Sequence, residues 1–280
     1  MKLACFELMD WEKDYLSEKF GNILEISFNS EVLNSESVST ARDAEGIVVF
    51  IYSTVNKEVV DQMPNLKFIA TMSTGFDHID IEECKRRNIV VSTVPTYGEN
   101  TVAEHTFALI FAISRRIIES YERVKERNFS PAGLTGFDLF GKTLGVIGVG
   151  NIGSHVIRIA KGIGMDVIAH KRTPDPKLAA DLGFRFVTID ELFAQSDIIT
   201  VHVPYNKETH HMLNSDAFAK MKNGVVVINT ARGAIVDTGA LLTAINSGKV
   251  GAAGLDVLEE EPLLREEHEL LHKDFAPEEL

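Results

Sequence analysis

Short apolar runs alternate with polar stretches through the first third of the chain. The apolar runs cover residues 3–8, 46–51, 67–71 and 89–91. The polar stretches between them, such as residues 12–20 and 81–87, are typical of helices. Strands that alternate with helices predict an α/β domain with a parallel sheet.

The same alternation is clearer after residue 143. Strands are predicted at residues 143–149, 166–169, 197–203, 225–229 and 250–256. Helices are predicted at residues 190–195, 216–221 and 239–246, and after the first strand, where Ile152, Val156, Ile159 and Ile163 share one face. Thr188 and Glu191 have the spacing of a capping box. We therefore predict a second, doubly wound parallel sheet.

A hinge is predicted at residues 96–100, where Gly98 stands among polar residues. A long apolar helical pattern follows over residues 101–118, and its face is formed by Val102, His105, Leu109, Ala112 and Ile113. The expected domains are residues 1–98 and 99–280.

Composition narrows the class of protein. The 280 residues are 45% apolar and 25% charged, which is typical of a globular protein of this size. No apolar run approaches the roughly 18 residues of a membrane span, and residues 1–10 do not resemble a signal peptide, so a cytoplasmic location is expected. The net charge of −13 argues against nucleic acid and anionic membranes as partners. Cys5 and Cys84 are expected to pack as small apolar side chains, and no metal site is expected.

A glycine-rich sequence, GVGNIG at residues 148–153, leaves one predicted strand and opens a helix. Gly148 would permit the tight turn, Gly150 would let the backbone approach a pyrophosphate, and Gly153 would allow close packing of the helix on the sheet. The helix N-terminus would face the phosphates. The alternative is an ordinary glycine-rich turn, but this context favours dinucleotide binding.

Lys171 and Arg172 follow the next predicted strand, where an acidic residue would normally bind the adenosine ribose of NAD. Two cations there would instead attract a 2′-phosphate. NADP(H) is therefore favoured within an NAD(P)(H) site, and a solvated basic turn is the alternative.

Two further loops carry charge at the predicted carboxyl ends of strands. Arg232 follows the strand at residues 225–229 and could bind a carboxylate through two parallel hydrogen bonds. Glu259, Glu260 and Glu261 follow the strand at residues 250–256. Taken alone, each loop could be an ordinary solvated surface.

Together these sequences resemble the D-2-hydroxyacid dehydrogenase family. The matching motifs are GVGNIG, HVPYN, NTARGAIVD and GLDVLEEEP, with STGFDHID and VPTYGENTVAEHT in the first half. The resemblance implies a Rossmann NAD(P)-binding domain, a flavodoxin-like substrate domain and hydride transfer between nicotinamide and a small 2-oxo or 2-hydroxy acid. D-lactate and pyruvate, glyoxylate or hydroxypyruvate are the candidate substrates.

The resemblance also implies roles for individual residues. Arg232 would bind the substrate carboxylate and polarise its carbonyl, and Glu261 would hold the catalytic histidine and raise its pKa. The substrate carboxylate would be received by the backbone around Ser73, Thr74 and Gly75. The dinucleotide would be lined by Asn151, Ile152, Val203, Pro204, Thr209, Thr230, Ala231 and Asp256, with Asp256 nearest the nicotinamide amide. Phe50, Ile51 and Tyr52, at the end of a predicted strand, could form an apolar wall for a small substrate side chain or simply pack in the core.

The histidine of the family lies in a Pro-His sequence beyond the Glu-Pro segment, and residues 263–280 contain no such sequence. His268 and His272 are interpreted as surface residues, His105 as helix packing, His170 and His202 as strand ends, and His210 and His211 as a turn. We therefore expect the acid/base histidine, and a segment that completes the substrate domain, beyond residue 280. A chain that ends at Leu280 is expected to bind dinucleotide and turn over 2-oxo acids poorly.

Two other functions compete with this hypothesis. One is a nicotinamide-sensing regulatory protein that resembles the C-terminal-binding-protein corepressors, and the other is an inactive dinucleotide-binding fragment. A homodimer is expected through the apolar helix at residues 101–118 and the loop at residues 129–139, which resembles the arm that family members exchange.

Overall fold

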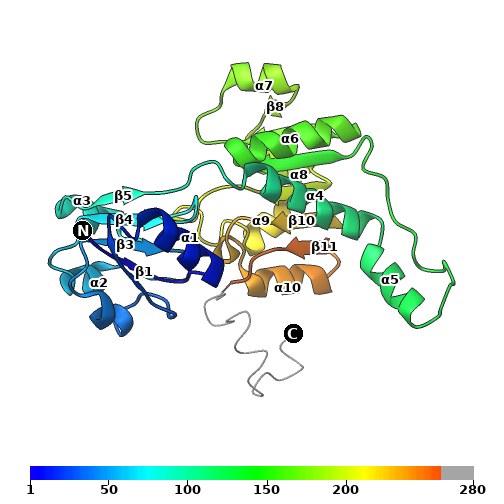
Figure 1. The fold of residues 1–280 in the computed structure, drawn as a ribbon. Helices are drawn as coiled ribbons and strands as arrows, with labels where there is room; N and C mark the ends of the chain where they lie inside the picture. The colour runs from blue at the N-terminus through cyan, green and yellow to red at the C-terminus, as the bar shows by residue number, and fades with distance from the viewer. Residues whose placement is uncertain (260–280) are drawn as a thin grey trace. The chain divides into compact units, whose positions relative to one another are not determined.

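The computed structural model describes residues 1–259, and the chain divides into two compact units, Met1–Gly98 and Glu99–Leu280. Each unit is a parallel α/β sheet with helices packed on it (Figure 1). The predicted fold class is confirmed.

The first unit contains five parallel strands in the order β2-β1-β3-β4-β5. Its elements are β1 (Lys2–Cys5), α1 (Asp10–Phe20), β2 (Glu25–Phe28), β3 (Gly46–Val49), α2 (Lys57–Asp61), β4 (Phe68–Thr71), α3 (Ile81–Arg86) and β5 (Val90–Ser92). This strand order is that of the flavodoxin-like folds. The alternation of side chains along β1 places Ala4 in the core on one face and Leu3 and Cys5 in the core on the other.

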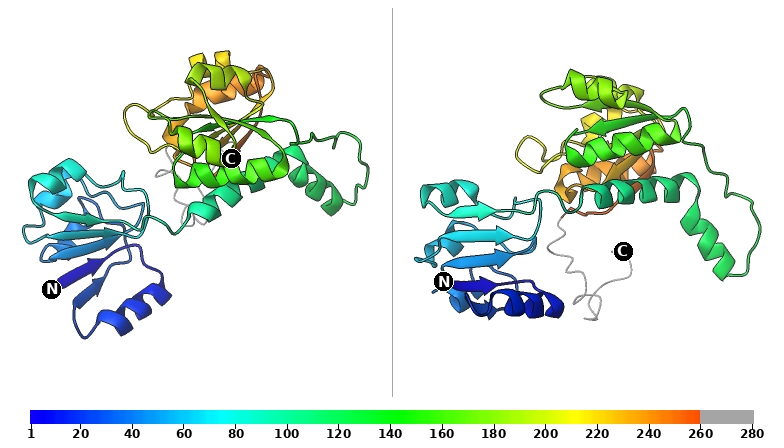
Figure 2. Two further views of the ribbon diagram at one scale, coloured as in Figure 1. Left: turned by 90° about the horizontal axis from the view of Figure 1, so that it is seen from above. Right: turned by 45° about the horizontal axis from the view of Figure 1, so that its top comes forward.

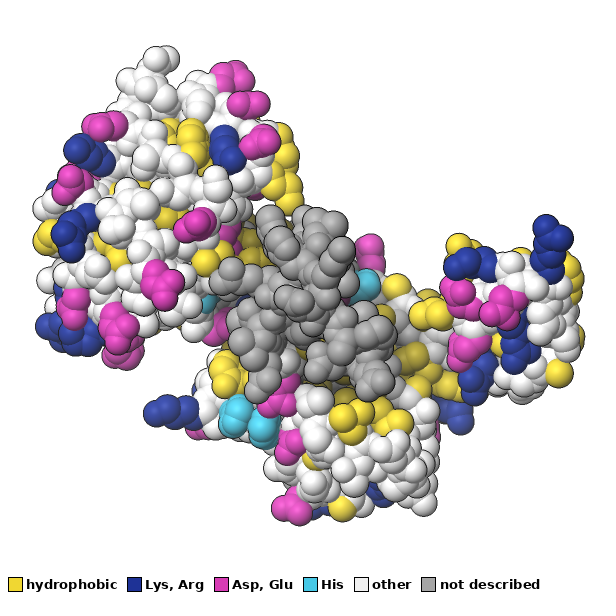
Figure 3. All heavy atoms as spheres, turned by 90° about the horizontal axis from the view of Figure 1, so that it is seen from below, with side chains coloured by type: hydrophobic (Ala, Val, Ile, Leu, Met, Phe, Trp, Pro, Cys, Tyr) yellow, Lys and Arg dark blue, Asp and Glu magenta, His cyan; other side chains and the backbone are white. Residues whose placement is uncertain are grey.

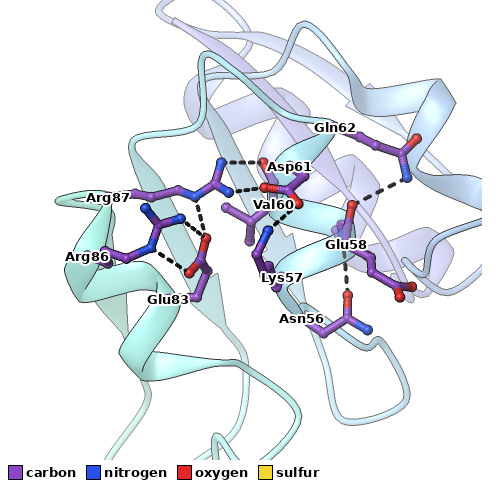
Figure 4. Close-up of polar contacts among 10 residues, drawn as sticks. Asn56, Lys57, Glu58, Val60, Asp61, Gln62, Glu83, Arg86 and Arg87 are labelled. Carbon is purple, nitrogen blue, oxygen red and sulfur yellow. Dashed lines mark hydrogen bonds and ion pairs between the residues drawn. The ribbon is translucent and has the colours of Figure 1, made fainter.

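Helices α2 and α3 of this unit are joined by a network of charges (Figure 4). Glu83, which is buried on α3, accepts hydrogen bonds from Arg86 and Arg87, and Arg87 also pairs with Asp61 of α2. The hydrogen bond from Arg86 is the main reason why the pKa of Glu83 falls to about 2. Arg87, which is also bound by the ionised Glu83, therefore links the end of α3 to Asp61 of α2.

The second unit contains six parallel strands in the order β11-β10-β9-β6-β7-β8. Its strands are β6 (Thr143–Ile147), β7 (Asp166–His170), β8 (Arg185–Phe186), β9 (Ile198–Val201), β10 (Val225–Asn229) and β11 (Val250–Leu255). Its helices are α4 (Glu99–Ser114), α5 (Ile117–Lys125), α6 (Asn151–Ile163), α7 (Pro176–Leu182), α8 (Ile189–Gln195), α9 (Ser215–Lys220) and α10 (Thr238–Asn246). Counted from β6, the order is the 3-2-1-4-5-6 arrangement of the Rossmann fold.

Two apolar cores cover the faces of this second sheet. Residues of α4 and α6 pack on one face, and residues of α8, α9 and α10 pack on the other (Figures 1 and 2). The predicted capping box is present, since Thr188 and Glu191 exchange hydrogen bonds at the start of α8. Both cysteines are buried, as predicted.

The prediction of a single helix over residues 101–118 is wrong. Helix α4 ends at Ser114, and Arg116 adopts a left-handed conformation with φ of 50° before α5 begins. Helix α5 and the segment that follows it extend away from the sheet of this unit (Figure 2). No residue of α5 is buried. Within the described part of the chain, no helix combines the length and the apolar character needed to cross a membrane.

Candidate active site

Five loops of the second unit begin at one edge of its sheet. Because the strands are parallel, the loops after β6, β7, β9, β10 and β11 all leave the carboxyl-terminal edge. This edge is where open α/β sheets bind ligands, and the strand order reverses between β6 and β9. The residues predicted from the sequence to bind dinucleotide or carboxylate in this unit lie on these loops or at the first turn of α6.

The loop after β6 has the shape that a pyrophosphate requires. Gly148 has φ of +96°, and a side chain there would collide with the backbone of His202. A side chain at Gly153 would collide with the carbonyl of Gly148, so α6 packs closely on the loop. Gly150 faces open space, no side chain caps α6, and its first turn carries no acidic residue. Backbone N–H groups at this helix end can therefore receive an anion.

Helix α4 touches three of these loops. Glu99 accepts a hydrogen bond from the Asn151 side chain, and Thr106 Oγ1 lies 3.1 Å from Thr230 Oγ1. His105 Nε2 lies 3.1 Å from Asp256 Oδ1. The interpretation of His105 as helix packing is wrong, because its side chain is 46% exposed and the buried face of α4 contains Ala103, Thr106, Phe107, Ile110 and Ser114.

The loops after β7 and β9 lie on either side of β6. Lys171 is half-buried, and the exposed Arg172 pairs with the exposed Glu208 at 3.3 Å. Thr209 is buried and donates a hydrogen bond of 2.8 Å to the carbonyl of Pro204, which closes the turn after Val203. Burial lowers the pKa of His202 to about 4, so this imidazole is neutral at physiological pH.

The turn that presents Arg232 is built on a buried asparagine at the end of β10. Asn229 Nδ2 donates to the Arg232 carbonyl at 2.9 Å, and Asn229 Oδ1 accepts from the Ala231 N–H at 3.1 Å. The Asn229 carbonyl accepts from the Asp256 N–H at 3.0 Å. Arg232 is half-buried and donates from Nη1 to the Ala231 carbonyl. One amide side chain therefore fixes the turn between Thr230 and Arg232.

The corresponding edge of the first unit carries the other predicted site residues. Ser73 is buried, donates to the Gly75 carbonyl at 2.7 Å and contacts Thr71, while Thr74 donates to the Val94 carbonyl at 2.8 Å. These bonds hold the loop after β4 in one conformation.

The neighbouring loop after β3 carries Phe50, which is half-buried, and Tyr52, which is 43% exposed. The Glu7 carboxylate accepts hydrogen bonds from the N–H groups of Phe50, Tyr52 and Ser53. Neither residue belongs to an apolar core of the first unit, so the alternative of core packing is not confirmed, and the apolar wall stays a prediction.

The geometry of the second unit fits a dinucleotide. Gly150, which has open space beside it, is the N-cap of α6, no side chain caps that helix end, and two cations follow the next strand. A guanidinium and a carboxylate, Arg232 and Asp256, leave the adjacent strands β10 and β11. Glu261, His268 and His272 lie outside the described residues. The fold and these loops define a dinucleotide-binding oxidoreductase.

Comparison with known proteins identifies the family. The model of the D-isomer specific 2-hydroxyacid dehydrogenase NAD binding domain matches residues 107–275. The D-lactate dehydrogenase of Escherichia coli is 39% identical over 267 residues, which cover 93% of this chain and 80% of that protein. The glyoxylate reductase of Thermococcus litoralis is 40% identical over 233 residues, which cover 81% of this chain and 70% of that protein.

A solved structure agrees with these sequences. The D-lactate dehydrogenase of Aquifex aeolicus, in complex with NAD and lactic acid, matches with a TM-score of 0.91 and 37% identity over 98% of this chain and 82% of that one. The chain belongs to the D-isomer specific 2-hydroxyacid dehydrogenase family. It is an enzyme that transfers a hydride between a nicotinamide dinucleotide and a small 2-oxo or 2-hydroxy acid. The regulatory alternative is not favoured, because these relatives are named as dehydrogenases and reductases.

Several residues that shape the site were missed from the sequence. Glu99 and His105 belong to the VPTYGENTVAEHT motif, yet their contacts with Asn151 and Asp256 depend on how α4 packs. Asn229 opens the NTARG motif, and a polar residue at the end of an apolar strand was a signal that could have found it. His211 was interpreted only as part of a turn, and it contacts Glu259.

Proposed function

We propose that this enzyme interconverts pyruvate and D-lactate, with glyoxylate and hydroxypyruvate as alternative 2-oxo acids. The observation that carries the proposal is the similarity, over 98% of the chain, to a D-lactate dehydrogenase that binds NAD and lactic acid. The names of the relatives from Escherichia coli and Thermococcus litoralis support the same small substrates.

Arg232 is proposed to bind the substrate carboxylate and to polarise the carbonyl that is reduced. Its guanidinium stays charged and can make two parallel hydrogen bonds to one carboxylate. Its position on a turn fixed by Asn229 supports this role. The N–H groups around Ser73, Thr74 and Gly75 are proposed to receive the same carboxylate, and Phe50 and Tyr52 to limit the size of the side chain beside it.

The proposed chemistry is balanced by one hydride and one proton. The dinucleotide, when bound, supplies the hydride for reduction or accepts it in oxidation. A histidine donates the proton to the carbonyl oxygen as the alcohol forms, and Glu261 is proposed to keep that imidazole protonated near neutral pH. Gly148, Gly150, Asn151, Ile152, Gly153, Val203, Pro204, Thr209, Thr230, Ala231 and Asp256 are the residues proposed to hold the dinucleotide.

NADP(H) is proposed as the preferred dinucleotide. The description of the matching family names NAD. The proposed preference for NADP(H) therefore rests on Lys171 and Arg172 of this chain and not on the family. The pair between Arg172 and Glu208 is exposed to solvent on both sides, and such surface pairs contribute little energy. Arg172 can therefore exchange Glu208 for a 2′-phosphate at small cost.

A homodimer is proposed through the surface expected from the sequence, residues 101–118 and 129–139. We call α5 together with residues 126–140, which contain the expected loop, the arm. Ile118 is 65% exposed and Phe129 is 77% exposed, so the arm leaves large apolar side chains in water. On the face drawn in Figure 3, hydrophobic side chains show among charged ones on the lobe that projects from the second unit. A second copy would cover such a surface.

Substitution of Arg232 by Lys tests the central role in the proposed function. An ammonium keeps the charge but cannot make the planar two-pronged contact, so kcat/KM for pyruvate should fall roughly 10- to 100-fold, the equivalent of one charge-assisted hydrogen bond. Binding of the dinucleotide, measured by fluorescence titration, should not change. Normal kinetics with pyruvate would remove Arg232 from the mechanism, and an equal loss of dinucleotide affinity would assign it to the cofactor instead.

A further inference from the structure

Glu7 is an acidic residue at the carboxyl edge of the first sheet, on the loop after β1. Its backbone has φ of 60°, a left-handed conformation that is uncommon for residues other than glycine. Its neighbours on both sides, Phe6 and Leu8, are buried. The Phe6 N–H donates to the Val48 carbonyl of β3 at 2.9 Å. Glu7 is therefore held at a fixed place beside the end of β3.

The carboxylate of Glu7 binds the backbone of the loop after β3. Its Oε2 atom accepts hydrogen bonds from the N–H groups of Phe50 at 3.1 Å and Ser53 at 3.0 Å. Its Oε1 atom accepts from the N–H of Tyr52 at 2.9 Å. The Ser53 hydroxyl also donates to Oε2. Because hydrogen bonds to a carboxylate are stronger than those between neutral groups, one side chain of the loop after β1 holds residues 50–53.

Both ends of this short loop are anchored in the first unit. At one end, Val49 belongs to β3 and is buried. At the other end, Ser53 is 1% exposed, and its hydroxyl accepts a hydrogen bond of 2.9 Å from the Leu33 N–H. The Thr54 N–H donates to the Leu33 carbonyl at 2.7 Å. Glu7 therefore determines the path of a segment of three residues, 50–52, between two fixed points.

The loop held by Glu7 follows the strand beside the one that leads to Ser73. In the parallel register of β3 and β4, Val49 pairs with Thr71, and the Met72 N–H donates to the Val49 carbonyl at 2.9 Å. Phe50 and the Ser73 loop therefore emerge from neighbouring strands at the same edge. In the proposed function the Ser73 loop receives the substrate carboxylate, so the position of Phe50 determines the room beside it.

We propose that Glu7 is a positioning residue that determines which size of 2-oxo acid the enzyme accepts. The proposal rests on the proposed function, which gives Phe50 and Tyr52 the role of limiting the substrate side chain. Glu7 does not touch the substrate. It fixes the backbone that carries these two side chains, so that a methyl group such as that of pyruvate fits beside them and a longer side chain fits less well.

Replacement of Glu7 by Gln separates this role from a purely structural one. Glutamine has the same shape, but it has one acceptor oxygen and an NH₂ group that can only donate. That NH₂ group would face an N–H of the loop, and two donors cannot bond to each other. Residues 50–52 should then leave their present path. A loss of folded enzyme, by contrast, would lower the rates with all substrates by the same factor.

The test measures kcat and KM for glyoxylate, pyruvate and 2-oxobutyrate at saturating dinucleotide. Glu7→Gln is the main variant, Glu7→Asp is a milder one that keeps both acceptor oxygens on a shorter side chain, and Phe50→Ala reports on the wall itself. Glu45→Gln is the matched control, because Glu45 links β1 and β3 at the opposite edge by accepting from the Lys2 N–H and from Lys67 Nζ. Thermal unfolding and fluorescence titration of the dinucleotide accompany every variant.

The unmodified enzyme should prefer pyruvate to 2-oxobutyrate in kcat/KM by at least about tenfold, the usual effect of one methylene group in a fitted pocket. Glu7→Gln should remove most of this preference, mainly by raising KM for pyruvate, because Glu7 does not contact the reacting atoms. Glu7→Asp should act in the same direction to a smaller extent, and Phe50→Ala should act like Glu7→Gln. Glu45→Gln should keep the preference, and the affinity for dinucleotide should stay unchanged in all four variants.

Three results would overturn the proposal in distinguishable ways. If Phe50→Ala lowers the preference for pyruvate while both Glu7 variants keep it, or lose rate equally with every acid, the positioning role is wrong and the wall stands. If Phe50→Ala also keeps the preference, the wall is wrong and the positioning role fails with it, although reduction of 2-oxo acids stands. If the unmodified enzyme reduces none of the three acids, the proposed function itself fails.

Discussion

Two adjacent cations, Lys171 and Arg172, are proposed to distinguish between two cofactors that differ by one phosphate. Lys171 is half-buried at the carboxyl edge, whereas Arg172 already has an acidic partner in Glu208. A carboxylate at this place would repel a 2′-phosphate, and a pair of cations attracts one. The proposed preference for NADP(H) therefore rests on charge at two positions rather than on the shape of the fold.

The double variant Lys171→Ala and Arg172→Ala should weaken NADPH binding and leave NADH binding nearly unchanged. Each lost charge-assisted hydrogen bond is worth about 1.5–3 kcal/mol, so the NADPH dissociation constant should rise at least tenfold. Lys177→Ala is the control, because Lys177 lies beyond the same strand and pairs with Asp181. Fluorescence titration measures both cofactors. Tighter or equal binding of NADH by the unmodified enzyme would contradict the preference.

The location of residues on the loops that follow strands could be predicted from the sequence. In a parallel sheet, the loop after every strand leaves the same carboxyl-terminal edge. Gly148, Lys171, Arg232 and Asp256 are of this kind. The contact of His105 with Asp256 could not be predicted from the sequence, because it depends on how α4 is rotated about its own axis. The apolar pattern of α4 includes small and polar residues and does not determine that rotation. His211 and Glu259 are 48 residues apart in sequence, and only the packing of α10 and β11 brings them together.

Among the elements, the long predicted helix shows where local pattern is insufficient. Ile117 and Ile118 continue the apolar composition of α4, and the chain nevertheless turns at Arg116 before α5 begins. The strands β2 and β8 were missed because β2 has no fully buried residue and β8 has two residues. Helix α7 was missed although Asp175 caps it, Pro176 opens it and Gly183 ends it.

The arm should be the dimer interface. Ile118→Glu combined with Phe129→Glu should convert the enzyme from dimer to monomer, because buried charges without partners are costly. Leu242→Glu is the matched control, as Leu242 is an exposed apolar residue on α10 of the same unit. Sedimentation at micromolar concentration distinguishes the states. A clean monomer for the unmodified enzyme would contradict the proposal.

At the scale of the whole molecule, the alternation of strands and helices was sufficient to predict two parallel α/β sheets, and the motifs were sufficient to predict the family. The order of the strands within each sheet was not predicted from the sequence, because it depends on the side of the sheet to which each connecting helix carries the chain. The two orders, one flavodoxin-like and one Rossmann, give each unit a carboxyl edge lined by loops. Function then depends on the residues that these loops carry.

We expect the enzyme to reduce a small 2-oxo acid stereospecifically with a nicotinamide dinucleotide. A direct test follows the absorbance of NADPH and NADH when the enzyme is mixed with pyruvate, glyoxylate or hydroxypyruvate, and determines the configuration of the lactate formed. We predict one equivalent of dinucleotide oxidised per equivalent of D-lactate. Dinucleotide binding without turnover of any of the three acids, or formation of L-lactate, would contradict the proposed function.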